Sequence, residues 1–355
     1  MDLQDVVALS VITGLTRSRA FAAYKQLRVS EGEPTLEDVI ACAGRDADVE
    51  HIALEARTRA TVLLAAAVRA RIEIIRSDGE KYPALLREIY DPPPVLWLRG
   101  DVRVFQHPAI AIVGSRAASA YALEVASRLA AELAARGVLV VSGLARGADA
   151  AAHRGCLDAG GVTLGVLGSG LDRIYPPEHD LLAEQICRSG AIVSELAPDA
   201  PPLPDHFPAR NRLISGISLA VVVVEANEKS GSLITARFAL EQGREVMAVP
   251  GSVLGGRNRG SHALLKDGAK VVETADDILE ALGPQAPAVP KISGNSLQTD
   301  ELLQKLTPGQ SYDPDEMSAT VGLTGSRLLA RLTEWEMNGR LTKVAGGRYV
   351  LAGRN

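Results

Sequence analysis

Between residues 82 and 282, short aliphatic runs alternate with longer helical stretches, and this alternation restricts the fold more than any other feature of the sequence. The helical stretches often end at a glycine, as at Gly137, Gly160 and Gly190. Strands that alternate with helices of this length form parallel βαβ units in a doubly wound sheet. We therefore predict an α/β fold whose mostly parallel strands cover residues 109–113, 138–141, 162–167, 191–194, 219–224, 246–249 and 270–272.

Composition narrows the class of protein further. Hydrophobic residues make up 46% of the chain and aromatic residues 4%, so the core must be aliphatic. The formal net charge is −5, so any nucleic-acid site has to be a local patch on an acidic background. Cys42, Cys156 and Cys187 are far apart, which indicates reduced thiols rather than a disulfide framework or a zinc site.

The chain is predicted to have three domains. Residues 1–77 form a small helical domain of the SAM or helix-hairpin-helix type, with a long helix over residues 49–71. Ile12-Thr13-Gly14-Leu15 resembles the hairpin of such a motif, but Thr16 stands where its second glycine is expected, which favours a packing or partner-binding helical domain. Residues 78–283 hold the sheet, and residues 284–298 form a Pro-containing linker. Residues 299–355 predict a winged helix, with helices over 300–306, 315–320 and 324–338 before a hairpin of strands at 340–344 and 348–351.

Glycine, small hydroxyl residues and arginine follow the predicted strands. Gly114, Ser115 and Arg116 come directly after the first strand of the alternating region. A glycine lets backbone amides approach a ligand, and a helix N-terminus favours an anion. We expect a phosphate here, with Arg116 as a forked donor; an ordinary turn with a surface arginine, paired for example with Asp149, is the alternative.

Two further strand ends repeat this pattern. Ser142, Gly143, Arg146 and Gly147 follow the second strand, and Gly168-Ser169-Gly170 follows the third. Asp149 and His153 share a helical face there. A catalytic pair is one interpretation, and a helix cap beside a packed histidine is the other.

The densest basic cluster near the sheet is Phe207-Pro208-Ala209-Arg210-Asn211-Arg212. A phenylalanine beside arginines can stack on a base, although Phe207 could equally belong to the core. After the fifth strand, Lys229, Ser230, Gly231, Ser232 and Thr235 open a helix and predict an anion nest.

Missing motifs exclude several enzyme classes. The sequence has neither the G-x-x-x-x-G-K-[ST] loop of P-loop NTPases nor the G-x-S-x-G elbow of α/β-hydrolases. The first βα turn lacks G-x-G-x-x-G, and the second strand ends in Ser142 rather than an acidic residue, which argues against NAD. No His, Cys and carboxylate set has metal-ligand spacing, so we expect neither a metal nor a cofactor.

Taken in order, these motifs resemble the DprA (Smf) family of DNA-processing proteins. The resemblance spans residues 82–282 and includes the segments 111–116, 142–149 with His153, 168–172 with Tyr175-Pro176, 207–212, 230–236 and 249–251. It implies an extended Rossmann-like domain that binds single-stranded DNA in a basic pocket, where the family's G-S-R arginine matches Arg116. Some relatives have lysine just after Tyr-Pro, whereas Pro177-Glu178-His179 follow in this chain.

The resemblance also implies a role without catalysis. It implies protection of DNA taken up in natural transformation and loading of RecA for homologous recombination. The implied partners are single-stranded DNA, RecA, single-strand-binding protein and a second copy of the chain. The acidic N-terminus lacks a signal peptide, and the apolar run at 219–224 is too short to span a bilayer, so we expect a cytoplasmic protein.

The main alternative is a nucleoside-monophosphate hydrolase of the same superfamily. Those enzymes use a P-G-G-x-G-T-x-x-E signature at the position of residues 229–235, where this chain has no proline. The first carboxylate beyond Thr235 is Glu241, more than a helical turn away, so the catalytic acid of the signature is missing. A nucleotide-binding sensor is a third class that the sequence leaves open.

Overall fold

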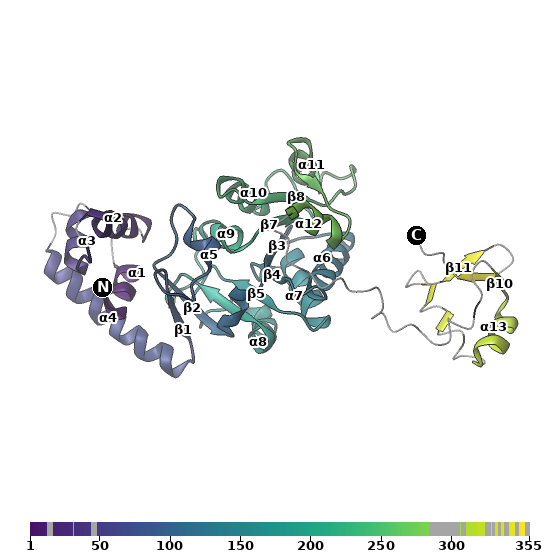
Figure 1. The fold of residues 1–355 in the computed structure, drawn as a ribbon, viewed down its shortest axis with the longest axis horizontal. Coiled ribbons are helices and arrows are strands. Elements are labelled where there is room, and N and C mark those ends of the chain that lie inside the picture. The colour runs from purple at the N-terminus through teal and green to yellow at the C-terminus, as the bar shows by residue number, and fades with distance from the viewer. Residues whose placement is uncertain are drawn as a thin grey trace. The chain divides into compact units, whose positions relative to one another are not determined.

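The computed structural model describes residues 1–12, 17–30, 32–43, 48–283, 306, 310–323, 328, 331–332, 335–336, 341–344 and 348–351. The chain divides into two compact units, Met1–Val289 and Pro290–Asn355, which are described separately (Figure 1). Within the described ranges, no helix has both the length and the apolar character needed to cross a membrane.

A nine-stranded sheet forms the centre of the first unit, with the order β1-β2-β6-β5-β4-β3-β7-β8-β9. Each pair among β3 to β9 is parallel, whereas β1 pairs with β2, and β2 with β6, antiparallel. The predicted fold class, a mostly parallel doubly wound sheet, is confirmed. The strands are β1 Glu73–Arg76, β2 Val95–Gly100, β3 Ala109–Val113, β4 Leu139–Ser142, β5 Thr163–Val166, β6 Ala191–Ser194, β7 Ala220–Val223, β8 Glu245–Ala248 and β9 Lys270–Val271.

The first two strands were not predicted. Residues 73–76 fall inside the region predicted as a helical domain, but β1 pairs along its whole length with β2 at the sheet edge. Trp97 in β2 is fully buried, and its neighbours from Val95 to Leu98 are buried as well. A four-residue run carries too little periodicity to reveal a strand without its partner.

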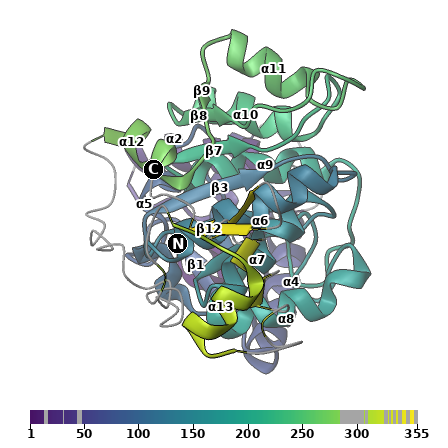
Figure 2. The same cartoon turned by 90° about the vertical axis from the view of Figure 1, so that its right-hand side faces the viewer.

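Both faces of the sheet are covered, which explains the uninterrupted apolar runs. In β3, Ala109, Ala111 and Val113 join one hydrophobic core, while Ile110 and Ile112 join another. Successive side chains of a strand point to opposite faces, so each face must have its own layer of helices. Those helices are α5 Ala84–Arg87, α6 Ala120–Ala134, α7 Ala148–Asp158, α8 Asp180–Ser189, α9 His206–Ile217, α10 Ser232–Glu241, α11 Arg259–Lys266 and α12 Ala275–Leu282. Both views place α10 and α11 beside β7 and β8 (Figures 1 and 2).

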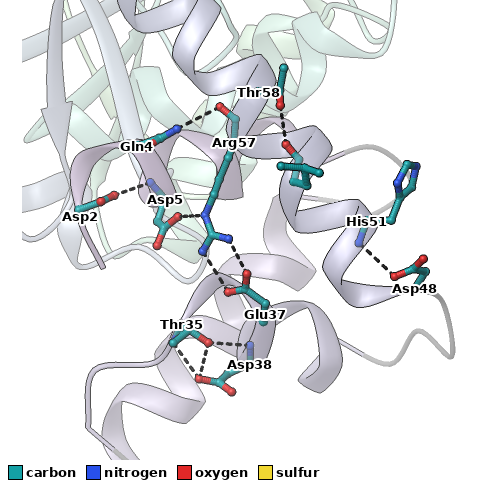
Figure 3. Close-up of polar contacts among 11 residues, drawn as sticks. Asp2, Gln4, Asp5, Thr35, Glu37, Asp38, Asp48, His51, Arg57 and Thr58 are labelled. Carbon is teal, nitrogen blue, oxygen red and sulfur yellow. Dashed lines mark hydrogen bonds and ion pairs between the residues drawn. The ribbon is translucent and has the colours of Figure 1, made fainter.

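Four N-terminal helices precede the sheet: α1 Leu3–Val11, α2 Arg17–Ser30, α3 Leu36–Cys42 and α4 Val49–Arg69. Arg57 of α4 joins them, because its guanidinium donates to Asp5 of α1 at 2.6 Å and to Glu37 of α3 at 2.5 and 3.0 Å (Figure 3). The hydrogen bond with Arg57 is the main reason why the pKa of Glu37 is lowered. The proposed helix-hairpin-helix glycine, Gly14, lies outside the described residues.

The second unit contains a small antiparallel sheet in the order β10-β12-β11, with β10 at Ser311–Tyr312, β11 at Leu341–Val344 and β12 at Arg348–Leu351. Asp313 is the N-cap of helix α13, Pro314–Val321, and forms a capping box with Glu316. The helices expected at 300–306 and 324–338 fall largely outside the described residues, so the winged helix stays a prediction.

Candidate functional site

A pocket of about 450 Å³ opens at the carboxyl ends of β3 and β7. Strand β3 has β4 on one side and β7 on the other, so the chain order reverses between β3 and β7. Ligands of doubly wound proteins bind at such a switch point. The pocket walls come from the turn after β3, the turn after β7 and the start of α9. The predicted site residues that line it are Gly114, Ser115, Arg116, Phe207, Arg210, Asn211, Lys229, Ser230, Gly231, Ser232 and Thr235.

The turn after β3 is held close to the start of α7. A Cβ atom on Gly114 would lie 2.7 Å from the Cβ of Ala148, so only glycine fits there. The Ser115 amide donates to the Glu225 carbonyl at 2.8 Å, which joins this turn to the end of β7. Arg116 is exposed, and its guanidinium lies 5.6 Å from the centre of the Phe207 ring. Among the described residues it forms no ion pair, so its charge is available to a ligand.

The turn after β7 supplies hydroxyl groups and the start of a helix. The hydroxyls of Ser230 and Ser232 are 2.7 Å apart, and α10 begins at Ser232. The Lys229 amide donates to the Asn227 side chain at 2.9 Å, and the Asn211 amide group donates to the Gly231 carbonyl at 3.2 Å. Hydroxyls, a cation and the positive end of a helix together suit a phosphate.

Arg210 was predicted to contact phosphate, but the structure buries its side chain under the pocket. It donates to the Gly143 carbonyl at 2.7 Å and to the Val166 carbonyl, and so connects the ends of β4 and β5. Burial lowers the pKa of Arg210 to about 10, and the neighbouring Asp149 opposes that shift. Burial also disfavours the charged form of Asp149 and raises its pKa, whereas the positive charge of Arg210 acts to lower it. The guanidinium of Arg210 therefore binds mainly backbone carbonyls inside the protein, and its contact with phosphate stays a prediction.

Two other predicted arginines lie outside the pocket. Arg212 is largely buried and binds Glu195 at 2.7 Å and Asp91 at 2.9 Å. Burial disfavours its charge, but Glu195 and Asp91 outweigh burial and raise the pKa of Arg212. Arg146 is exposed and paired with Glu178 at 2.5 Å. Both were predicted to bind DNA phosphate, but neither lines the pocket and each is paired with a carboxylate, so their contact with DNA stays a prediction.

The remaining predicted residues allow close backbone packing. A Cβ on Gly147 would lie 2.2 Å from the Ser115 carbonyl oxygen, and a Cβ on Gly170 would lie 2.2 Å from that of Ala197. Gly168 packs against the Phe207 ring, and the Ser142 hydroxyl donates to the Ile112 carbonyl at 2.6 Å. Gly143 and Ser169 are buried, and none of these six residues lines the pocket.

Asp149 and His153 do not form a catalytic pair. Asp149 accepts hydrogen bonds from the amides of Gly143 at 3.1 Å and Ala145 at 3.4 Å, so it holds the preceding loop. The expected helix cap is wrong in detail, because Gly147 occupies the N-cap position and makes no side-chain bond. His153 is fully buried with Nδ1 2.7 Å from the Thr163 hydroxyl, and burial lowers the pKa of His153 to about 3.

Sequence reasoning missed some residues of the site. Asn227 and Ala117 line the pocket, and both follow strand ends that were predicted. Tyr175 packs on Phe207 with ring centres 5.3 Å apart and is 37% exposed, which extends the aromatic surface beside Arg116. Because Tyr175 and Phe207 are far apart in the sequence, no local sequence pattern indicates that their rings are in contact. The described residues contain no group of three or more His, Cys, Asp or Glu that could hold a metal ion.

These features define a doubly wound α/β protein with a pocket of amide, hydroxyl and cationic groups at its switch point. Residues 73–283 match the family model described as DNA recombination-mediator protein A. The chain is 41% identical over 289 residues to Protein Smf of Escherichia coli, covering 78% of this chain and 76% of that protein. The chain therefore belongs to the DNA recombination-mediator protein A family.

Two solved structures support this assignment. DNA processing protein A from Streptococcus pneumoniae superposes with a TM-score of 0.71 at 34% identity, covering 79% of this chain and 98% of that one. The protein of the same name from Helicobacter pylori, whose structure is described by its single-stranded DNA binding mode, matches with a TM-score of 0.53 at 31% identity. That match covers 59% of this chain and 98% of the other.

Proposed function

We propose that the chain binds single-stranded DNA through phosphate groups in the pocket at the end of β3 and β7, with little dependence on base sequence. The observation that carries the proposal is Arg116, an exposed arginine without a carboxylate partner among the described residues, at the mouth of a pocket rich in hydroxyls and backbone amides. Backbone amides and arginine read phosphate, while Phe207 and Tyr175 offer ring faces to any base.

The family extends the proposal to DNA processing. The binding described for the Helicobacter pylori relative supports single-stranded DNA as the ligand. We further propose that the chain protects DNA taken up in natural transformation and transfers it to RecA. A homodimer and an interaction with single-strand-binding protein belong to the same proposal. These steps follow from the family resemblance and are tested separately from the pocket.

Binding without catalysis agrees better with the pocket than hydrolysis does. Asp149 is the carboxylate of the pocket lining, and it is buried, bonded to two backbone amides and placed beside Arg210. Glu241 lies at the end of α10, paired with Arg237 at 3.6 Å, and lines a different cavity. A general acid for cleaving a nucleotide would have to reach the ligand, and neither carboxylate is placed to do so.

Replacing Arg116 by alanine tests the proposal. The loss of one charge-assisted contact, about 1.5–3 kcal/mol, should weaken binding of single-stranded DNA roughly ten- to a hundredfold. The slope of log affinity against log salt should fall by about 0.7, the value for one phosphate on a single strand. Arg188→Ala is the matched control, because Arg188 is 76% exposed on α8 and outside the pocket. Equal affinity for duplex and single strand, or wild-type binding by Arg116→Ala, would contradict the proposal.

A further inference from the structure

We propose that the loop of residues 250–259 forms a second nucleotide subsite, which binds the nucleotide next to the one held at Arg116. The subsite is a separate pocket of about 460 Å³ lined by Ser119, Tyr121, Leu254, Arg257 and their neighbours. This inference rests on the proposed function, since it assumes that single-stranded DNA occupies the first pocket. It specifies the path that the DNA strand takes away from the first pocket, and it names residues that extend the contact between protein and DNA.

The two pockets share a rim. Ala117 lines the first pocket, and its carbonyl oxygen accepts a hydrogen bond of 2.9 Å from Arg257 in the second. Ser115 in the first pocket donates its amide to the Glu225 carbonyl, and Glu225 also lines the second pocket. A chain leaving the first pocket over Ala117 would therefore reach the second one directly.

Arg257 supplies the charge that a second phosphate needs. It is exposed and forms no ion pair with another described residue, whereas the nearby Arg259 faces Glu228 at 3.8 Å. No ion pair joins Arg257 to Glu225 in the described part of the chain, and the oxygens of that carboxylate accept hydrogen bonds from the Ser119 hydroxyl at 2.6 Å and the Ser119 amide at 3.1 Å. Arg257 is thus available to bind an anion, whereas Arg259 already faces the carboxylate of Glu228.

Tyr121 and Leu254 supply the surface for a base. Tyr121 is 53% exposed, yet its hydroxyl donates to the Pro250 carbonyl at 3.1 Å, so the ring is held in place. Leu254 also lines this pocket and is 78% exposed. A fixed aromatic ring in the same pocket as an exposed aliphatic side chain suits stacking by any base, and stacking tolerates different sequences.

The loop is built to keep this shape. The Asn258 side chain is buried under the loop and donates to the Ser252 carbonyl at 3.2 Å. A Cβ on Gly251 would lie 2.4 Å from that side chain, so the backbone packs directly on it. Because the loop is already ordered, binding of a nucleotide should require little additional loss of conformational freedom.

Binding of a labelled oligothymidylate of about twenty nucleotides to full-length variants tests the inference. Arg257→Ala should weaken binding about tenfold and lower the salt slope by about 0.7. Tyr121→Ala should weaken it about five- to tenfold, and Tyr121→Phe, which keeps the ring, by less than about twofold. Arg259→Ala is the matched control from the same loop and should change affinity by less than about twofold.

The short probe is thymidine 5′-monophosphate, a single nucleotide that can occupy only the first pocket, measured by competition. Arg257→Ala should leave its affinity unchanged, since the first pocket is intact, while Arg116→Ala should weaken both probes. Equal effects of Arg257→Ala and Arg259→Ala, or wild-type binding by Arg257→Ala and Tyr121→Ala, would overturn the second subsite alone. Loss of mononucleotide binding in Arg257→Ala would also overturn it, because Arg257 would then merely support the first pocket. An unchanged affinity in Arg116→Ala would refute the proposed function itself.

Discussion

Replacing Gly147 by alanine should damage both the stability of the first unit and its pocket. Gly147 is the N-cap of α7 and has φ 74° and ψ −126°, a backbone conformation that residues with a Cβ rarely adopt. The added Cβ would lie 2.2 Å from the carbonyl oxygen of Ser115 and 2.8 Å from that of Arg116. The turn that carries the phosphate site would have to move away by about 1 Å to regain ordinary van der Waals contact.

The expected cost combines two effects. Backbone strain contributes about 1–3 kcal/mol, and overpacking against a backbone carbonyl contributes a similar amount. The free energy of unfolding should therefore fall by roughly 2–6 kcal/mol, and Tm by at least about 5 °C. Displacement of Ser115 and Arg116 should also weaken binding of single-stranded DNA, by about tenfold if one phosphate contact is lost.

Gly160→Ala separates strain from the close contact. Gly160 follows the other end of α7 with φ 69°, and a Cβ there would meet nothing within 4 Å. This variant should lose about 1–2 kcal/mol of stability from strain and keep its affinity for DNA. Urea unfolding and fluorescence anisotropy on both variants provide the comparison. Equal losses of stability in the two variants, or unchanged DNA affinity in Gly147→Ala, would refute the reasoning.

Arg212→Met should cost about 3–5 kcal/mol, because it leaves the buried Glu195 unpaired. Arg212→Met/Glu195→Leu should regain part of that loss, and both should bind DNA normally; weakened binding in a folded variant would place Arg212 in the site. Burial keeps His153 neutral with a pKa of about 3, well below the usual 6.5, so the unfolded chain takes up this proton first as pH falls. This histidine therefore stabilises the fold above pH 6.5, and its contribution falls between pH 6.5 and 3, by up to about 1.4 kcal/mol per unit. Urea unfolding of His153→Gln should show a shallower dependence between pH 6.5 and 4, and parallel curves would contradict this assignment.

The sequence alone was enough to predict the parallel part of the sheet and the edge at which the pocket lies. The buried strands from β3 to β8 are short aliphatic runs separated by helices, and such a pattern is local and strong. The turns after β3 and β7 carry glycine, serine and a cation within a few residues, so Gly114–Arg116 and Lys229–Ser232 could be assigned to one edge of the sheet. Strands β1 and β2 could not be predicted from the sequence. They pair antiparallel at the edge of the sheet, and their runs carry no βαβ signal.

The role of each arginine was decided only by the tertiary structure. Arg116, Arg210 and Arg212 all occur in motifs of similar appearance, yet Arg116 is exposed, Arg210 is buried beside Asp149, and Arg212 is paired. The partner of Arg212, Asp91, is 121 residues away in the sequence, so no local pattern reveals it. A sequence determines where charged groups can occur along the chain. Whether a charge remains free for a ligand depends on burial and on carboxylates that only the folded chain brings close, because electrostatic interactions depend on distance in space and on exposure to water.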